Sequence, residues 1–250
     1  MTEATLHDAV ADEPPVLFCL PHAGASAATT YRSWDAELSD LVRVIPLELA
    51  GRGRRAGEPA YPSMRAAAWD CAHEVIAAAR SAPFALLGHS IGGLLAYEVD
   101  AALLELGARR PAAVAVSGTA APTRTARPAP IHALPDDGFL AAVEQFGGVP
   151  QIVLEHPAAR EYHLSILRSD FRIFERYEPA RPPHRLAGAL LVMHAAHDPV
   201  TAPQDPALWE QLTADDVTTW TVPTHDHFFL ETHRRQALAT LRAFLTRVLR

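Results

Sequence analysis

The sequence contains no lysine, and its basic residues are outnumbered. All 22 basic residues are arginine, and 29 acidic residues give a formal net charge of −7. Proteins that bind nucleic acid by neutralising phosphates carry a basic surface, so this excess of acidic residues argues against a nucleic-acid partner. Only 20 % of the residues are charged and 49 % are apolar. Such a composition argues against a disordered chain and supplies enough apolar surface for a large core.

Cysteine is scarce, and long apolar runs are missing. The two cysteines, Cys19 and Cys71, are too few for a disulfide framework. Each lies in an apolar or helical pattern, which predicts buried thiols in a reducing compartment. No apolar run approaches the roughly 20 residues that a membrane span needs. The start of the chain is polar and acidic, unlike a secretory signal. We therefore expect a cytoplasmic protein with no membrane partner, and we expect residues 1–15 to be disordered.

Short apolar runs alternate with longer helical patterns along most of the chain, whose 250 residues favour a single large domain. This alternation predicts an α/β fold with a mostly parallel central sheet and helices on both faces. The runs expected to form strands are Val16–Leu20, Val42–Leu47, Phe84–Leu87, Ala112–Ser117, Ala189–Met193 and Val217–Val222. The expected helices are Ser63–Ser81, Ile91–Leu106, Pro203–Leu212 and His233–Leu249.

One segment, residues 121–185, interrupts the alternation because it shows no convincing strand. A proline-rich stretch leads into helical patterns that end near Phe146 and that cover Ala159–Tyr177. A helical insertion between two strands of such a sheet usually covers the site at the carboxyl ends of the strands. We therefore predict a helical lid over residues 121–185 on a core of residues 16–120 and 186–250. The alternative is that these helices pack as an ordinary outer layer.

The strongest local signal is a G-x-S-x-G pattern between an expected strand and an expected helix. A nucleophilic serine needs a tight strand-to-helix turn, in which side chains two residues away would collide. The turn lifts the hydroxyl above the sheet, and the first amides of the helix face the developing negative charge. Ser90 is therefore the candidate nucleophile, and a glycine-rich turn without chemistry is the alternative. The pattern reads Gly88-His89-Ser90-Ile91-Gly92.

A serine nucleophile needs a base, and the base needs an acid that orients it. In this topology the acid and then the histidine follow the serine along the chain. Asp198 comes just after an expected strand, and both His225 and His227 come after the next one. We favour His227 as the base because the aromatic and apolar run behind it would anchor it by burial. The alternative for Asp198 is a turn that begins before Pro199.

Two backbone N–H groups must converge to bind the oxyanion of an acyl-transfer reaction. One comes from Ile91, the residue after the nucleophile. The other is expected from the loop after the first strand, where Ala23 is the candidate and Gly24 permits close approach.

The histidines near the candidate acid leave a second interpretation open. His194, His197, His225 and His227 could converge with Asp198 on a metal ion, which would leave Ser90 without a role. We regard this interpretation as the weaker one because it makes the serine turn a coincidence.

Taken together, the motifs resemble the type II (external, editing) thioesterases of polyketide and non-ribosomal peptide synthesis, over residues 16–245. The resemblance implies an α/β-hydrolase fold with a helical lid, acting without a metal or organic cofactor. The motifs that carry it are Pro21-His22-Ala23-Gly24, Ala50-Gly51-Arg52-Gly53-Arg54-Arg55, the serine turn continuing through Glu98, Ser169-Asp170-Phe171, Asp198, and His227-Phe228-Phe229-Leu230.

The resemblance further implies hydrolysis of stalled or wrongly primed acyl groups from the phosphopantetheine arm of an acyl or peptidyl carrier protein. Ser90, His227 and Asp198 would be the catalytic residues, and Ala23 and Ile91 would supply the oxyanion hole. A monomer is the default expectation. A carboxylesterase or acyl-CoA thioesterase, and a non-catalytic binding protein on the same fold, remain as alternatives. Arg52, Arg54 and Arg55 would meet an acidic carrier, or else form a solvated loop.

Overall fold

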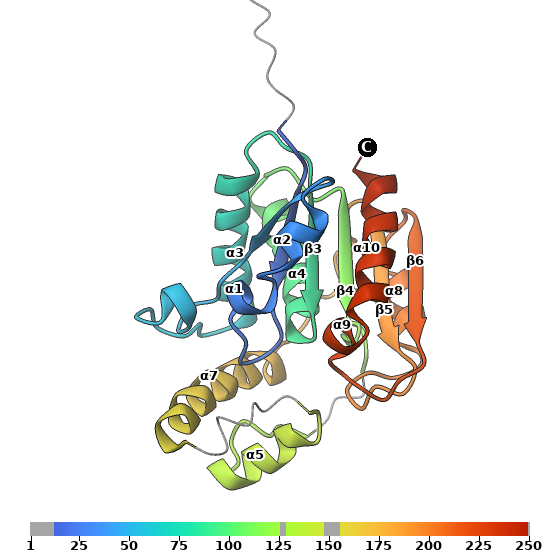
Figure 1. Ribbon diagram of the computed structural model, residues 1–250. Helices are drawn as coiled ribbons and strands as arrows, with labels where there is room; N and C mark the ends of the chain where they lie inside the picture. Colours follow the sequence, from blue (N-terminus) through green and yellow to red (C-terminus); the bar gives the residue numbers. More distant parts are fainter. Residues whose placement is uncertain (1–12, 126–128, 148–155, 250) are drawn as a thin grey trace, which may run out of the picture.

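A single sheet of parallel strands runs through the part of the chain that the computed structural model describes, residues 13–125, 129–147 and 156–249 (Figure 1). Its order is β2-β1-β3-β4-β5-β6. Every expected strand is present, with ends that differ from the prediction by two residues at most. The strands are β1 (Val16–Leu20), β2 (Arg43–Pro46), β3 (Phe84–His89), β4 (Ala113–Ser117), β5 (Ala189–Ala195) and β6 (Val217–Val222).

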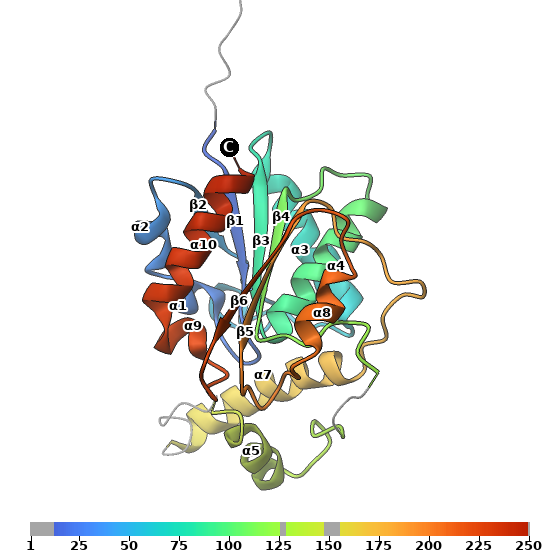
Figure 2. The ribbon, with the colours of Figure 1, turned by 90° about the vertical axis from the view of Figure 1, so that its right-hand side faces the viewer.

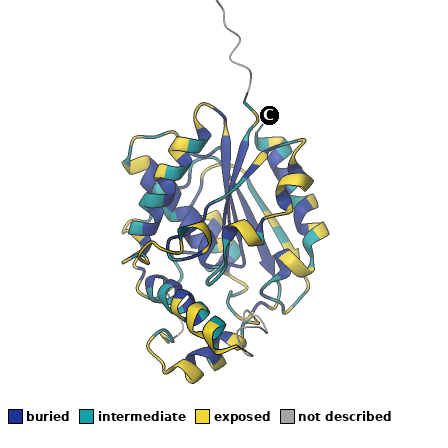
Figure 3. Cartoon of the chain, turned by 60° about the vertical axis from the view of Figure 1, so that its left-hand side comes forward, coloured by how far each residue is buried: buried dark blue, intermediate teal, exposed yellow. Residues whose placement is uncertain are grey.

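Helices cover both faces of the sheet, as Figures 1 and 2 show. Successive strand residues face opposite ways, so Phe18 packs into one core and Cys19 into the other. The first core lies under α3 (Met64–Ala79), α4 (Ile91–Glu105) and α8 (Asp205–Glu210). The second core lies under α1 (Ala27–Thr30), α2 (Trp34–Leu38), α9 (Phe229–Thr232) and α10 (Arg234–Val248). The central strands β1, β3, β4 and β5 are accordingly almost entirely buried (Figure 3).

The order of the strands places a crevice at the carboxyl ends of β1 and β3. The chain runs from β1 to β2 on one side and then returns to β3 on the other side. Loops that leave β1 and β3 therefore turn in opposite directions, and ligands bind at such points in open α/β sheets. Leu20 at the end of β1 pairs with Gly88 in β3. The loop that begins at Pro21 thus lies beside the turn that carries Ser90.

The insertion between β4 and β5 contributes two described helices, α5 (Asp136–Glu144) and α7 (Pro157–Glu175). They lie beyond the carboxyl ends of the strands and do not form part of the layers that flank the sheet (Figures 1 and 2). A small core that includes Phe139, Leu164 and Leu167 joins them. The helices have the predicted location, and their role as a lid stays a prediction.

Three further expectations concern the start of the chain, the two cysteine thiols and the absence of a membrane-spanning segment. The expected disorder of residues 1–15 falls largely on residues 1–12, which lie outside the described ranges. Cys19 and Cys71 are free and buried, as predicted, and burial raises the pKa of each thiol. No helix among the described residues is long and apolar enough to cross a membrane.

Candidate active site

Ser90 occupies a strained turn that only its glycine neighbours permit. Its backbone has φ 57° and ψ −126° between β3 and α4, a conformation that costs free energy for a residue with a side chain. A Cβ atom on Gly88 would lie 1.9 Å from the carbonyl oxygen of Gly92. A Cβ atom on Gly92 would lie 2.4 Å from the carbonyl oxygen of Leu20. The two glycines of the pattern are therefore steric requirements of this turn.

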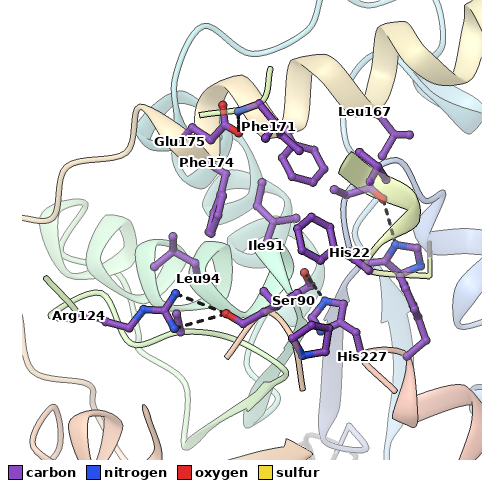
Figure 4. Close-up of a pocket in the computed structure, with 18 of the residues that line it drawn as sticks. His22, Ser90, Ile91, Leu94, Arg124, Leu167, Phe171, Phe174, Glu175 and His227 are labelled. Atoms are coloured by element: carbon purple, nitrogen blue, oxygen red, sulfur yellow. Dashed lines mark hydrogen bonds between the residues drawn. The ribbon is translucent and has the colours of Figure 1, made fainter. Parts of the chain in front are cut away.

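A connected set of hydrogen bonds links Ser90 to His227 and Asp198, as Figure 4 shows in part. The Oγ of Ser90 lies 2.9 Å from Nε2 of His227. The other ring nitrogen, Nδ1, lies 2.9 Å and 3.1 Å from the two carboxylate oxygens of Asp198. Since a carboxylate only accepts hydrogen bonds, Nδ1 carries the proton, and Nε2 accepts the serine hydroxyl. This arrangement has the geometry of a nucleophile, a general base and an orienting acid.

Each member of this set follows a different strand, so the parallel sheet brings them to one edge. Ser90 follows β3, Asp198 follows β5, and His227 follows β6. The Asp198 side chain is fully buried and that of His227 is 3 % exposed. The N–H of Val200 also donates to Asp198 at 2.8 Å, which holds the carboxylate in place.

His225, the alternative base, and its neighbour Asp226 have partners outside the Ser90 set. His225 stacks on His197, with ring centroids 4.5 Å apart. The carboxylate of Asp226 accepts hydrogen bonds from the Phe228 N–H and the hydroxyl of Thr232. Within the described ranges, no three His, Cys, Asp or Glu side chains are arranged to hold a metal ion.

The two backbone groups proposed for the oxyanion hole lie beside Ser90. Ala23 and Ile91 both line the cavity into which the Ser90 side chain opens. The N–H of Ser90 itself donates to the Ser117 carbonyl at 2.8 Å. Among the described residues, the N–H groups of Ala23 and Ile91 donate to no other group. Both are therefore available to a negatively charged oxygen, and their role remains a prediction.

Two further histidines, His89 and His22, lie in the neighbourhood of His227, and sequence reasoning did not place them there. His89 lies 5.1 Å from His227 and 6.1 Å from His22 between ring centroids. Burial lowers the pKa of His22 to about 4, and the neighbouring His227 ring adds to this effect. Burial and the same ring hold the pKa of His89 well below its usual value. Both rings are thus neutral near pH 7, which avoids a positive charge beside the base.

Because these rings are buried in their neutral form, we expect acid to lower the free energy of unfolding. His22 has a pKa of about 4 when folded and about 6.5 when unfolded, so the unfolded chain binds more protons between those values. The free energy of unfolding should fall as pH drops from 6.5 toward 4. Urea denaturation at pH 7, 6 and 5 measures this, and His22→Phe should show a shallower decline than the wild type. Equal declines in the two proteins would contradict this assignment.

A cavity of about 150 Å³ opens at Ser90 and extends beneath the insertion (Figure 4). Its two charged lining residues are already engaged: Arg124 pairs with Asp205 at 2.9 Å, and Glu175 accepts the Ile131 N–H at 2.7 Å. The cavity therefore presents an apolar wall suited to an alkyl or acyl chain. Most of the lining is apolar, from Ile91, Leu94, Ile131, Val143, Phe146, Leu167, Phe171 and Phe174.

For the three neighbouring arginines the sequence leaves two interpretations open, a carrier-docking patch and a solvated loop, and the structure shows each of them in an ion pair. Arg52 is buried and paired with Asp170, and Arg55 pairs with Glu58, Asp70 and Glu74. Arg54 is exposed, with an ion pair to Glu74 at 3.0 Å. Arg52 therefore serves the interior of the protein, and the three arginines do not form a free basic patch.

The fold and this site define the class of protein. Parallel strands, a serine on a strained turn after β3, and an acid and a histidine after later strands together characterise an α/β-hydrolase. Comparison with known proteins then narrows the class. The family model described as "Thioesterase domain" matches residues 15–245. The chain belongs to this family of thioester hydrolases.

Relatives and solved structures agree with this assignment. "Probable cadicidin biosynthesis thioesterase" of Streptomyces griseus is 34 % identical over 87 % of this chain, and the match spans 58 % of that relative's length. The structure of ClbQ from the colibactin NRPS/PKS pathway superposes with a TM-score of 0.88 at 29 % identity, covering 94 % of this chain and 98 % of ClbQ. The structure of the type II thioesterase BorB from the borrelidin biosynthetic cluster superposes with a TM-score of 0.79 at 28 % identity, covering 93 % of this chain and 92 % of BorB. The resemblance to type II thioesterases is thus confirmed.

Proposed function

We propose that this protein hydrolyses acyl groups held as thioesters on the phosphopantetheine arm of carrier proteins, and so clears stalled or wrongly primed units from an assembly line. The observation that carries this proposal is the Ser90–His227–Asp198 set at the mouth of an apolar cavity. ClbQ from the colibactin NRPS/PKS pathway and the type II thioesterase BorB from the borrelidin biosynthetic cluster are similar over most of this chain, which supports the proposal. An acyl or peptidyl carrier protein is accordingly the proposed partner.

The proposed reaction begins with attack of the Ser90 Oγ on the thioester carbonyl. His227 takes the hydroxyl proton at Nε2 as the C–O bond forms, and the N–H groups of Ala23 and Ile91 bind the oxyanion. The intermediate then collapses, the C–S bond breaks, and His227 returns the proton to the departing thiolate. The acyl group is now an ester on Ser90, and the carrier leaves with a free thiol.

The second half of the reaction releases the acid. Water gives a proton to Nε2 of His227 and attacks the ester carbonyl, and the same two N–H groups bind the second oxyanion. Collapse returns the proton to Ser90 and frees the carboxylic acid. Asp198 keeps His227 in the required tautomer and stabilises its charged form. No step in this sequence calls for a metal or an organic cofactor.

Removing the charge of Asp198 should slow the reaction strongly. In Asp198→Asn an amide faces Nδ1 of His227, which favours the tautomer that cannot accept the serine proton. We expect kcat to fall roughly 10²- to 10⁴-fold in steady-state thioester hydrolysis. Asp226→Asn is the matched control, because Asp226 adjoins His227 in sequence but bonds to Phe228 and Thr232. Equal losses in the two variants would contradict the role given to Asp198.

Covalent labelling tests whether the serine is a nucleophile at all. A fluorophosphonate probe should add one equivalent to the wild-type protein, and peptide mass mapping should place the adduct on Ser90. His227→Ala should label far more slowly because the base is gone. A protein that stays unlabelled would support the non-catalytic alternative and would exclude the proposed mechanism.

A further inference from the structure

A buried ion pair between Arg52 and Asp170 lies beside the site, and the proposed chemistry assigns it no role. Two parallel bonds of 2.6 Å join the guanidinium to the two carboxylate oxygens, and each side chain is only 4 % exposed. Arg52 follows β2, whereas Asp170 lies in the C-terminal half of α7. Bidentate pairs of this kind fix orientation as well as distance. The pair therefore ties the insertion to the core at one defined position.

The same carboxylate also holds the loop that follows β1. Oδ2 of Asp170 accepts the N–H of Gly24 at 2.8 Å. Nη1 of Arg52 donates to the carbonyl of Ala25 at 3.4 Å. These residues form a tight turn in which the Ala25 N–H donates to the His22 carbonyl at 3.2 Å. The ion pair thus contacts this turn at two consecutive residues.

Helix α7 also packs directly on this turn. Gly24 has φ +77°, and a Cβ atom there would lie 2.7 Å from Cδ2 of Leu167 and 3.3 Å from the ring of His163. Leu167 lines the cavity as well (Figure 4). One helix therefore touches both the acyl cavity and the turn that contains Ala23, and Asp170 makes the polar link between them.

We propose that Asp170 is a positioning residue for the oxyanion hole, acting through the N–H of Gly24. The inference rests on the proposed function, which gives the N–H of Ala23 its role. The N–H groups of Ala23 and Gly24 lie on either side of a single Cα, so holding the second restrains the direction of the first. Oxyanion donors must lie about 2.7–3.1 Å from the charged oxygen. A shift of about 1 Å is enough to lower the rate roughly 10²-fold.

Three variants separate positioning from mere stability. Asp170→Leu leaves Gly24 without its acceptor and Arg52 buried without a partner, so both stability and kcat should fall. Arg52→Met with Asp170→Leu removes both charges, and apolar replacement of a buried pair is often neutral or stabilising. The double variant should therefore recover its melting temperature, while its kcat stays about 10- to 100-fold low with KM little changed. Asp170→Asn retains an oxygen for Gly24 and should keep more kcat than Asp170→Leu.

A second buried ion pair supplies the control. Asp100 in α4 is fully buried and pairs with Arg110, and it contacts neither the turn nor the cavity. Asp100→Leu should lower the melting temperature because it leaves Arg110 without its carboxylate partner. It should not lower kcat at a temperature where all variants are folded. Recovery of kcat together with stability in the double variant would overturn the inference, as would equal kcat in Asp170→Asn and Asp170→Leu. A wild-type protein that does not hydrolyse thioesters would instead refute the proposed function.

Discussion

Replacing Ser90 by alanine should lower kcat for thioester hydrolysis by roughly 10³- to 10⁶-fold, the largest effect expected of any substitution in this protein. The hydroxyl is the atom that attacks the carbonyl, and the side chain's contact at 2.9 Å is with His227. Alanine preserves the backbone conformation at φ 57° as well as serine does, so the variant should fold normally. Single-turnover kinetics with an acyl thioester and a thermal melt measure the two quantities separately.

The control for this prediction is Ser39→Ala. Ser39 is exposed at the end of α2 and donates only to the Ala36 carbonyl. Its loss should change neither kcat nor the melting temperature appreciably. Residual activity in Ser90→Ala within about tenfold of the wild type would show that another group carries the reaction.

Gly88→Ala should have the largest effect on stability. The new methyl group would lie 1.9 Å from the Gly92 carbonyl oxygen, and the three nearest atoms all belong to the backbone. A flexible side chain could move aside, but here β3 and α4 would have to separate. We expect a loss of at least about 3 kcal/mol in the free energy of unfolding, or no folded protein. Chemical denaturation followed by circular dichroism measures it.

Gly57→Ala is the matched control for the added methyl group. A Cβ atom on Gly57 would meet nothing within 4 Å, so this variant should stay within about 0.5 kcal/mol of the wild type. A Gly88→Ala protein of wild-type stability and activity would contradict the steric account of the turn.

The sheet was predictable because its strands are short apolar runs bounded by loops. Strand β1 matches its prediction at both ends, and β3 extends two residues further. The short helices α1, α2 and α9 were not predicted, since four or five residues are too few to show a helical period. Tertiary packing around residues such as Trp34 stabilises them instead.

The catalytic geometry was predictable for a different reason, namely that order along the chain determines position at the sheet edge. Asp198 and His227 each follow a strand by a few residues, so a parallel sheet must bring them near Ser90. Arg52 and Asp170 are 118 residues apart, and Asp170 lies within a helix of the insertion and not at the end of a strand. An arginine in a polar loop is ordinarily expected to be exposed. The burial of Arg52 depends on the position of α7, which the sequence does not show.

The most direct test compares three substrates that share one short acyl group: the thioester of a holo-carrier protein, the thioester of coenzyme A, and an oxygen ester. The measurement is kcat/KM for each substrate with the wild-type protein and with Ser90→Ala. The carrier-bound thioester should be cleaved fastest, and Ser90→Ala should abolish its hydrolysis. Faster cleavage of the coenzyme A thioester would favour an acyl-CoA thioesterase, and faster cleavage of the oxygen ester a carboxylesterase. Either result would contradict the proposed function.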